Sequence, residues 1–177
     1  MSPDDARLED TRAWLRKAAL GLRGVGIDLG ADPPLLEHAL FHSQQAAEKS
    51  LKAVWAFHDA PFRKTHNLDE LGKECVRYHP GLKPLVLEAA SLSEYAWLYR
   101  YPGDTPEPTI AEAREAQDLA ARLNLAVLRL LPMKARPDRA LKPGEGPGIA
   151  EPGVAYAAEP RAKGRSKTTK RKRARVK

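Results

Sequence analysis

The chain has little of what stabilises or anchors many proteins of its size. Its one cysteine, Cys75, cannot form a disulfide bond within the chain, and no group of cysteines and histidines has zinc-site spacing. No window approaches the roughly 18 apolar residues that a membrane-spanning helix needs. The N-terminus lacks the apolar segment of a secretory signal peptide. These absences predict a cytoplasmic protein without a metal, a cofactor or a membrane-spanning segment.

No stretch of the sequence alternates apolar and polar residues over the length of a strand, and no repeat at a fixed period is present. Apolar residues instead recur every three or four positions in five segments separated by prolines and glycines. The predicted helices run from Ser2 to the glycines at 21–26, over about 34–58, 68–78 and 82–100, and from Thr109 to Pro132. The sequence therefore predicts an all-α bundle with four long helices and one short one.

Charge divides the chain into two parts. Residues 1–133 carry 16 basic and 19 acidic side chains, whereas residues 134–177 carry 14 basic and 4 acidic ones. The second part is first rich in proline and glycine and then, from Arg161, rich in lysine and arginine, which predicts a disordered tail. Its basic run, including Arg171, Lys172 and Arg173, could hold nucleic acid without sequence specificity or could only keep the chain soluble.

Residues 41–53 form the most informative stretch. They contain no proline or glycine, and their helical spacing gives one apolar face and one polar face. The polar line is His38, His42, Gln45, Lys49 and Lys52. Two histidines four residues apart could bind a metal, but no third ligand lies nearby in the sequence, so no metal site is predicted.

Three segments resemble the HEPN domain family, whose name stands for higher eukaryotes and prokaryotes nucleotide-binding. The sequence Gln-Gln-Ala-Ala-Glu-Lys of residues 44–49 is similar to the family's Gln-Ala-x-Glu-Lys helix, and Thr65-His66-Asn67-Leu68 is similar to its Thr-His-x-Leu segment. Residues 95–102, which begin at Tyr95 and end in Arg-Tyr-Pro, are similar to its Tyr…Arg-Tyr-Pro ending. Their order and spacing agree with the family over about residues 5–131.

The resemblance implies a four- to five-helix up-and-down bundle that is often a homodimer. It also implies work beside a small nucleotidyltransferase, in some cases as a toxin–antitoxin pair. Other members are metal-independent RNases that use an arginine followed, after four to six residues, by a histidine. No histidine of this chain has an arginine at that spacing, so catalysis is not predicted.

The candidate nucleotide- or phosphate-binding residues are Gln45, Lys49, His66, Tyr95, Arg100 and Tyr101. Gln45 and Lys49 could contact a nucleotide, or Lys49 could form a structural ion pair. His66 could be a donor or acceptor, or it could fix the turn before a helix. Arg100 could bind phosphate while a tyrosine stacks on a base, or it could cap its own helix with the tyrosines in the core.

The sequence thus predicts a nucleotide- or RNA-binding regulatory module, with no membrane contact, that works with a separate nucleotidyltransferase. One alternative is a metal-independent RNase toxin with an atypical site built on Arg100, His66 and a tyrosine. Another is a dimerising scaffold without a ligand.

Overall fold

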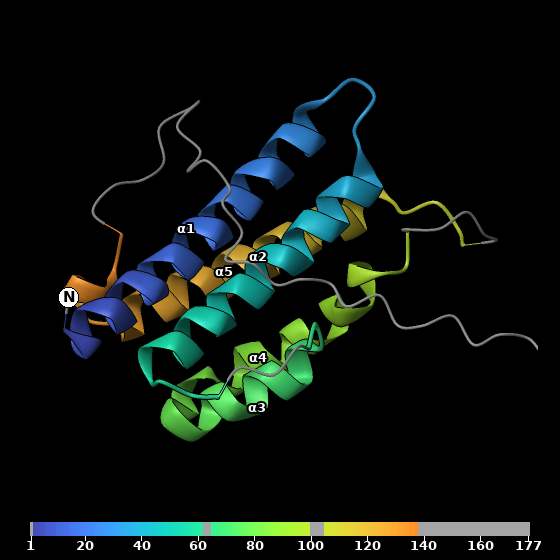
Figure 1. Ribbon diagram of the computed structural model, residues 1–177. Coiled ribbons are helices and arrows are strands. Elements are labelled where there is room, and N and C mark those ends of the chain that lie inside the picture. The colour runs from blue at the N-terminus through green and yellow to red at the C-terminus, as the bar shows by residue number, and fades with distance from the viewer. Residues whose placement is uncertain (1, 62–64, 100–104, 138–177) are drawn as a thin grey trace, which may run out of the picture. The chain divides into compact units, whose positions relative to one another are not determined.

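The computed structural model describes residues 2–61, 65–99 and 105–137, and every regular element in them is helical. The α-helices are α1 (Pro3–Gly30), α2 (Leu36–Phe57), α3 (Leu68–Tyr78), α4 (Lys83–Ala89) and α5 (Ile110–Leu130). Three 3₁₀ segments are η1 (Pro80–Leu82), η2 (Ala90–Ala96) and η3 (Met133–Ala135). Five α-helices without a strand in these residues confirm the predicted all-α class (Figure 1).

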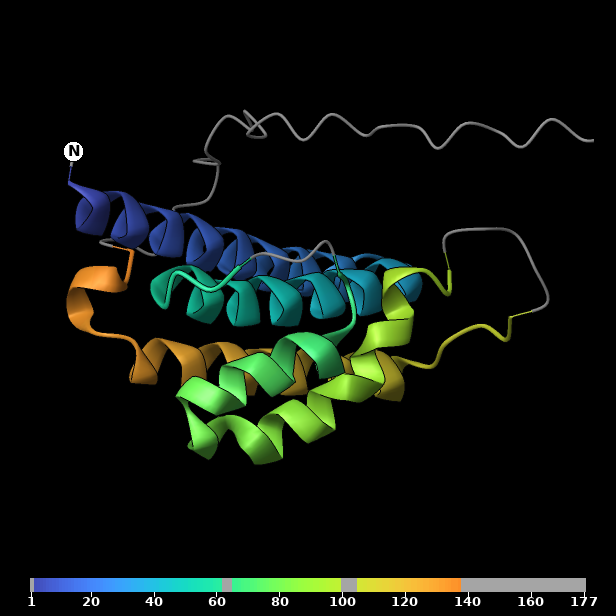
Figure 2. The same cartoon turned by 60° about the horizontal axis from the view of Figure 1, so that its bottom comes forward.

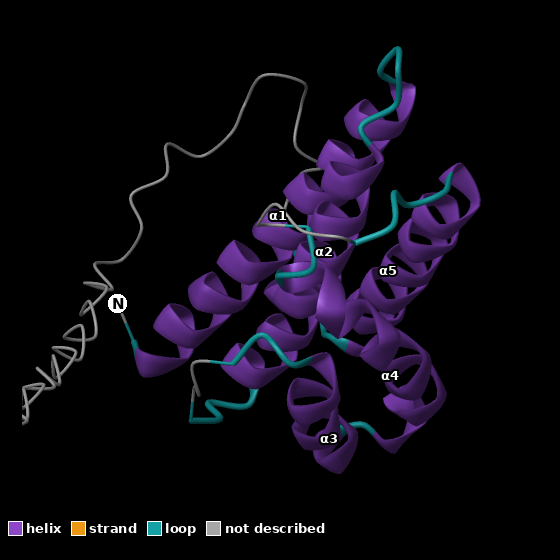
Figure 3. Ribbon diagram, turned by 90° about the vertical axis from the view of Figure 1, so that its right-hand side faces the viewer, coloured by secondary structure: helices purple, strands orange, loops and turns teal. Residues whose placement is uncertain are grey.

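Helix α2 is the centre of the bundle. It lies between α1 and α5, with α3 and α4 on a further side (Figures 2 and 3). Most of its residues from Ala39 to Ala56 are buried, including the polar residues Ser43, Gln44, Glu48 and Ser50. The prediction of one apolar and one polar face is thus too simple, because α2 has neighbours on several sides.

Helix α1 begins as predicted but does not end at the glycines near position 21. Ser2 accepts a hydrogen bond from the backbone N–H of Asp5, whose carboxylate accepts one from the backbone of Ser2. The helix then continues to Gly30. Two glycines instead allow a close approach to α2: a Cβ atom on Gly24 would lie 2.9 Å from Nδ1 of His42, and one on Gly21 would lie 3.2 Å from Cβ of Ala46.

The short helix α3 has the predicted bounds. Asn67 caps it by accepting hydrogen bonds from the N–H groups of Asp69 and Glu70, at 2.9 and 3.1 Å. The hydroxyl of Ser93, in η2, accepts a third bond from the N–H of Leu68 at 3.0 Å. Caps from its own sequence and from a distant element therefore both hold the start of α3.

The prediction of one long helix over residues 82–100 is wrong. The segment begins as α4 and changes after seven residues to the tighter winding of η2. Apolar spacings of three and four residues fit both kinds of helix, so periodicity could not distinguish them. At the change, the hydroxyl of Ser91 donates to the carbonyl of Glu88 three residues earlier, at 2.8 Å.

Helix α5 begins with a capping box, in which the hydroxyl of Thr109 accepts from the N–H of Glu112 and the carboxylate of Glu112 accepts from the N–H of Thr109. After α5 the described chain continues to residue 137. Within this last segment, Ala135 is fully buried. The first residues of the predicted tail, 134–137, are described and include part of η3, and the rest of it, from residue 138 onward, lies outside the described residues. None of the described helices combines the length and the apolar character needed to cross a membrane.

Candidate functional site

The site is built around the carboxylate of Glu48, which is completely buried on α2. Its Oε1 atom accepts hydrogen bonds from the ammonium groups of Lys49, at 2.9 Å, and Lys52, at 2.8 Å. Its Oε2 atom lies 2.9 Å from Nδ1 of His66 and accepts a bond from Nε2 of Gln44 at 3.2 Å. One carboxylate thus holds two cations, an amide and an imidazole, which we call the Glu48 cluster.

The charges of this cluster are settled by its electrostatics. Burial by itself raises the pKa of Glu48, but the neighbouring ammonium groups of Lys49 and Lys52 lower it to about 2. Burial also lowers the pKa of Lys49, against the opposite effect of Glu48. Glu48 is therefore ionised at neutral pH and can only accept hydrogen bonds. The hydrogen between Glu48 and His66 must then lie on Nδ1 of His66.

The cluster joins two segments that are separate in the sequence. Gln44 donates through the same Nε2 atom to the backbone carbonyl of His66 at 3.2 Å, and Gln45 donates to Oε1 of Gln44 at 2.6 Å. The contacts of His66 fix this residue, just before α3, against α2. The imidazole of His66 is nevertheless 61% exposed, and the side chain of Lys49 is 18% exposed. The structure therefore brings together Gln45, Lys49 and His66, three of the predicted binding residues.

The other predicted residues do not join this cluster in the described part of the chain. Tyr95 stacks on Tyr99, with 6.3 Å between ring centroids. Arg100 and Tyr101 lie outside the described residues, as do Arg171, Lys172 and Arg173 of the tail. Phosphate binding by Arg100, with a tyrosine stacked on a base, therefore stays a prediction.

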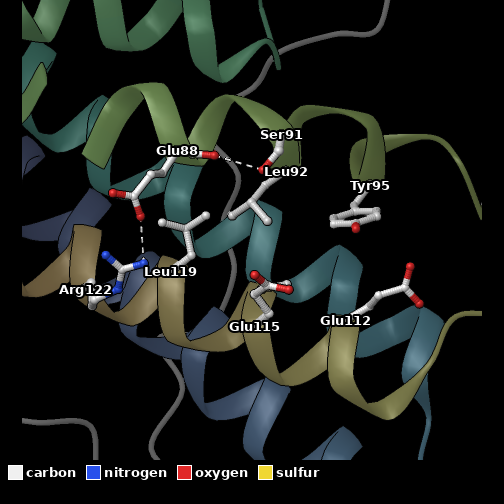
Figure 4. A pocket seen from close by; sticks show the side chains of 9 residues that line it. Glu88, Ser91, Leu92, Tyr95, Glu112, Glu115, Leu119 and Arg122 are labelled. Carbon is white, nitrogen blue, oxygen red and sulfur yellow. Dashed lines mark hydrogen bonds and ion pairs between the residues drawn. The ribbon is translucent and has the colours of Figure 1, made fainter. Parts of the chain in front are cut away.

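Tyr95 lines a different hollow, a groove of about 280 Å³ between α4–η2 and α5. Figure 4 shows Glu112 and Glu115 on α5 facing Tyr95, with Glu88 and Arg122 bonded to each other at the far end. Burial and then nearby glutamates raise the pKa of Tyr95. We call this hollow the Tyr95 groove, and its acidic lining is unfavourable for a phosphate group.

Comparison with protein families decides the classification. The HEPN domain profile matches residues 11–130, which is more than half of the chain. The chain belongs to the HEPN domain family. The matched range contains α2, α3, α4 and α5 completely and α1 from Thr11 onward, together with all of the Glu48 cluster. No curated protein and no solved structure matches the chain.

Family membership confirms the resemblance seen in the sequence. The Gln-Gln-Ala-Ala-Glu-Lys and Thr-His-Asn-Leu segments are two of the three on which the resemblance depends, and in this HEPN chain they meet at one carboxylate. Lys49 forms an ion pair with Glu48, which was the alternative to nucleotide contact in the sequence analysis. His66 is held by Glu48 and is still exposed. A structural role in the turn before α3 is therefore compatible with a role as a hydrogen-bond donor or acceptor for a ligand.

Sequence reasoning missed three members of this region: Glu48, Trp14 and Lys17. The ring of Trp14, on α1, lies 5.8 Å from the ammonium of Lys49 and 5.9 Å from that of Lys17. The Glu-Lys pair within the family segment was a sign of an internal ion pair. By contrast, no local pattern indicates that α1 would place Trp14 and Lys17 beside α2.

Two further histidine contacts lie apart from the cluster. Nδ1 of His42 lies 2.6 Å from Oδ2 of the buried Asp28, so His42 is held toward α1. His58 and His79 approach each other with 2.9 Å between their Nε2 atoms. No group of three or more histidine, cysteine, aspartate or glutamate side chains in the described residues could hold a metal ion.

Proposed function

We propose that this HEPN protein is a nucleotide- or RNA-binding regulatory module that acts as a homodimer with a separate small nucleotidyltransferase, in the manner of a toxin–antitoxin pair. The observation that carries the proposal is the Glu48 cluster. It joins two segments of the family pattern and presents His66 and part of Lys49 at the surface. A ligand there would meet a cation and an imidazole held in fixed positions.

The charge of the cluster supports an anionic ligand. Two ammonium groups share one carboxylate, so one positive charge is in excess. Lys17 on α1 adds another, and it is close enough to lower the pKa of Lys49, although less than burial does. An ammonium has three N–H donors, and Glu48 takes one from each lysine, so donors are left for phosphate oxygens.

Isothermal titration calorimetry of the full chain with ATP, GTP and a 12-nucleotide single-stranded RNA tests the binding function. We expect Lys49→Ala to weaken binding at least fivefold, because it removes the cation of the cluster that is partly exposed. Lys73→Ala is the matched control: Lys73 is exposed on α3, pairs with Asp69, and should not change the affinity. Absence of binding to all three ligands would contradict the proposal.

Size-exclusion chromatography with light scattering tests the homodimer and the partner separately. The full chain is run by itself for the first and together with the product of an adjacent nucleotidyltransferase gene for the second. A dimer and a larger complex support the proposal, and a monomer that forms no complex contradicts these two parts of it. A complex without nucleotide affinity would favour the scaffold function instead.

A second function, metal-independent RNA cleavage, is favoured by one specific observation. An ionised carboxylate on Nδ1 of a histidine orients the imidazole and leaves Nε2 to accept a proton, as in a general base. His66 could then deprotonate a 2′-hydroxyl without the usual arginine–histidine spacing. Incubation of labelled RNA in chelator with the full chain, and with His66→Ala as control, tests this. Intact RNA after long incubation excludes it.

A further inference from the structure

We propose that Nε2 of His66 accepts a hydrogen bond from the 2′-hydroxyl of a ribose, so that the Glu48 cluster selects ribonucleotide units over deoxyribonucleotide units. This inference rests on the proposed function and specifies its ligand. The shared chemistry is a ribose with a phosphate, which a free nucleotide and a single-stranded RNA both supply.

The contacts of His66 fix its tautomer. Glu48 is ionised and accepts the hydrogen bond from Nδ1, so in the neutral imidazole the lone pair lies on Nε2. Gln44 fixes the backbone carbonyl of the same residue, which limits rotation of the loop. The cluster therefore presents a hydrogen-bond acceptor in one orientation at the surface.

Two lysines lie beside this acceptor. The ammonium groups of Lys49 and Lys52 are held on the other oxygen of the same carboxylate, so donors and excess positive charge lie close to His66. An anion alone would use the lysines and leave Nε2 unused. A ligand that carries both a phosphate and a neutral O–H donor satisfies both, and a ribose phosphate is such a ligand.

The Tyr95 groove is the other location that could hold a nucleotide. The Tyr95 groove offers an aromatic ring, but Glu88, Glu112 and Glu115 line it and only Arg122 opposes them among its lining residues. Arg122 itself is bound to Glu88 and to Asp118, both at 2.8 Å. A phosphate group is therefore favoured at the Glu48 cluster.

The experiment compares matched ligands at pH 8.0, where imidazole side chains are ordinarily neutral. Calorimetry gives the dissociation constants of the full chain for ATP and dATP, and fluorescence anisotropy gives those for RNA and DNA 12-mers of one sequence. Chelator is present, and the RNA is checked for integrity afterwards. Because the basic tail is present in every variant, its contribution cancels when variants are compared.

We expect the ribo form to bind about tenfold more tightly than the deoxy form, which corresponds to about 1.4 kcal/mol for one hydrogen bond. His66→Ala should reduce this ratio to about 1 while leaving deoxy binding unchanged. His66→Gln, whose amide oxygen can accept, should keep part of the ratio. Lys49→Ala should weaken both forms equally, and His38→Ala, which changes an exposed histidine elsewhere on α2, should change neither.

The outcomes separate this inference from the function on which it rests. Selectivity only for ATP, or only for RNA, supports the inference and identifies the source of the ribose. Binding with equal affinity for ribo and deoxy forms, or a ratio that His66→Ala leaves unchanged, overturns the inference while the binding function stands. No binding of any of the four ligands overturns both.

Discussion

The Glu48 cluster and the Tyr95 groove both contain glutamates and basic side chains, but they place them in opposite surroundings. Glu48 is completely buried among two lysines, a glutamine and a histidine. In the groove, Glu88 is 49% exposed and its partner Arg122 is 46% exposed. The first arrangement has an excess of positive charge, and the second has an excess of negative charge.

The difference shows that burial decides how much an ion pair contributes to the stability of the fold. A buried charge depends on its partners, because removing one partner leaves the other desolvated and uncompensated. An exposed pair competes with water and contributes little. We therefore expect substitutions in the cluster to affect both stability and binding, and substitutions in the groove to affect neither.

The largest effect is expected for Glu48→Ala. The substitution leaves the ammonium groups of Lys49 and Lys52, both largely buried, without their carboxylate. The free energy of unfolding should fall by about 3–5 kcal/mol, measured by urea denaturation at pH 7. Glu88→Ala is the matched control and should leave the unfolding curve unchanged. Equal stability of Glu48→Ala and the parent chain would show that burial does not separate the two regions.

A somewhat smaller effect is expected on acidification. The pKa of Glu48 is about 2 in the folded chain against an ordinary value of 4.5, so the folded state binds this proton less readily than the unfolded state. Its contribution is complete above pH 4.5 and is lost as the pH falls towards 2, which amounts to about 3 kcal/mol. The measurement is the unfolding free energy at intervals between pH 6 and pH 2.

Glu48→Gln is the control for this titration, because it removes the ionisable group and keeps the side-chain length. Its free energy of unfolding should be lower at pH 6 but should fall less steeply with acid. Parallel curves for the two proteins would show that Glu48 does not carry the acid sensitivity.

Much of the fold could be predicted because its signals are local. The caps at Ser2, Asn67 and Thr109 lie within three residues of the groups they bind, and each marks the start of its own helix. The end of α1 could not be predicted, because Gly21 and Gly24 act through their contact with another helix. A glycine that ends a helix and one that allows close packing look alike in a sequence.

The candidate site could be predicted only in part for a similar reason. Gln45, Lys49 and His66 were found through their resemblance to family segments. The contact that unites them, between Glu48 and a histidine 18 residues later, depends on the fold. Helical periodicity also could not show that Glu48 lies in the interior, because it assumes a single apolar face.

A smaller effect on stability is expected for His66→Ala. Its imidazole donates to a charged group, but it is mostly exposed, and three other partners of Glu48 stay in place. The unfolding free energy should fall by about 1 kcal/mol, measured as for Glu48→Ala. A loss as large as that of Glu48→Ala would mean that His66 is part of the core and would argue against a role in ligand binding.

The smallest effect is expected for Arg122→Ala in the Tyr95 groove. Its guanidinium bridges Glu88 and Asp118 in solvent, where water and salt compete for the same groups, so the unfolding curve should not move. Nucleotide affinity should not fall either, because the phosphate is expected at the Glu48 cluster and not in this acidic groove. If affinity instead fell as much as in Lys49→Ala, the phosphate would lie against Arg122. The Tyr95 groove would then be the binding site, and the Glu48 cluster would serve only to fasten the loop before α3.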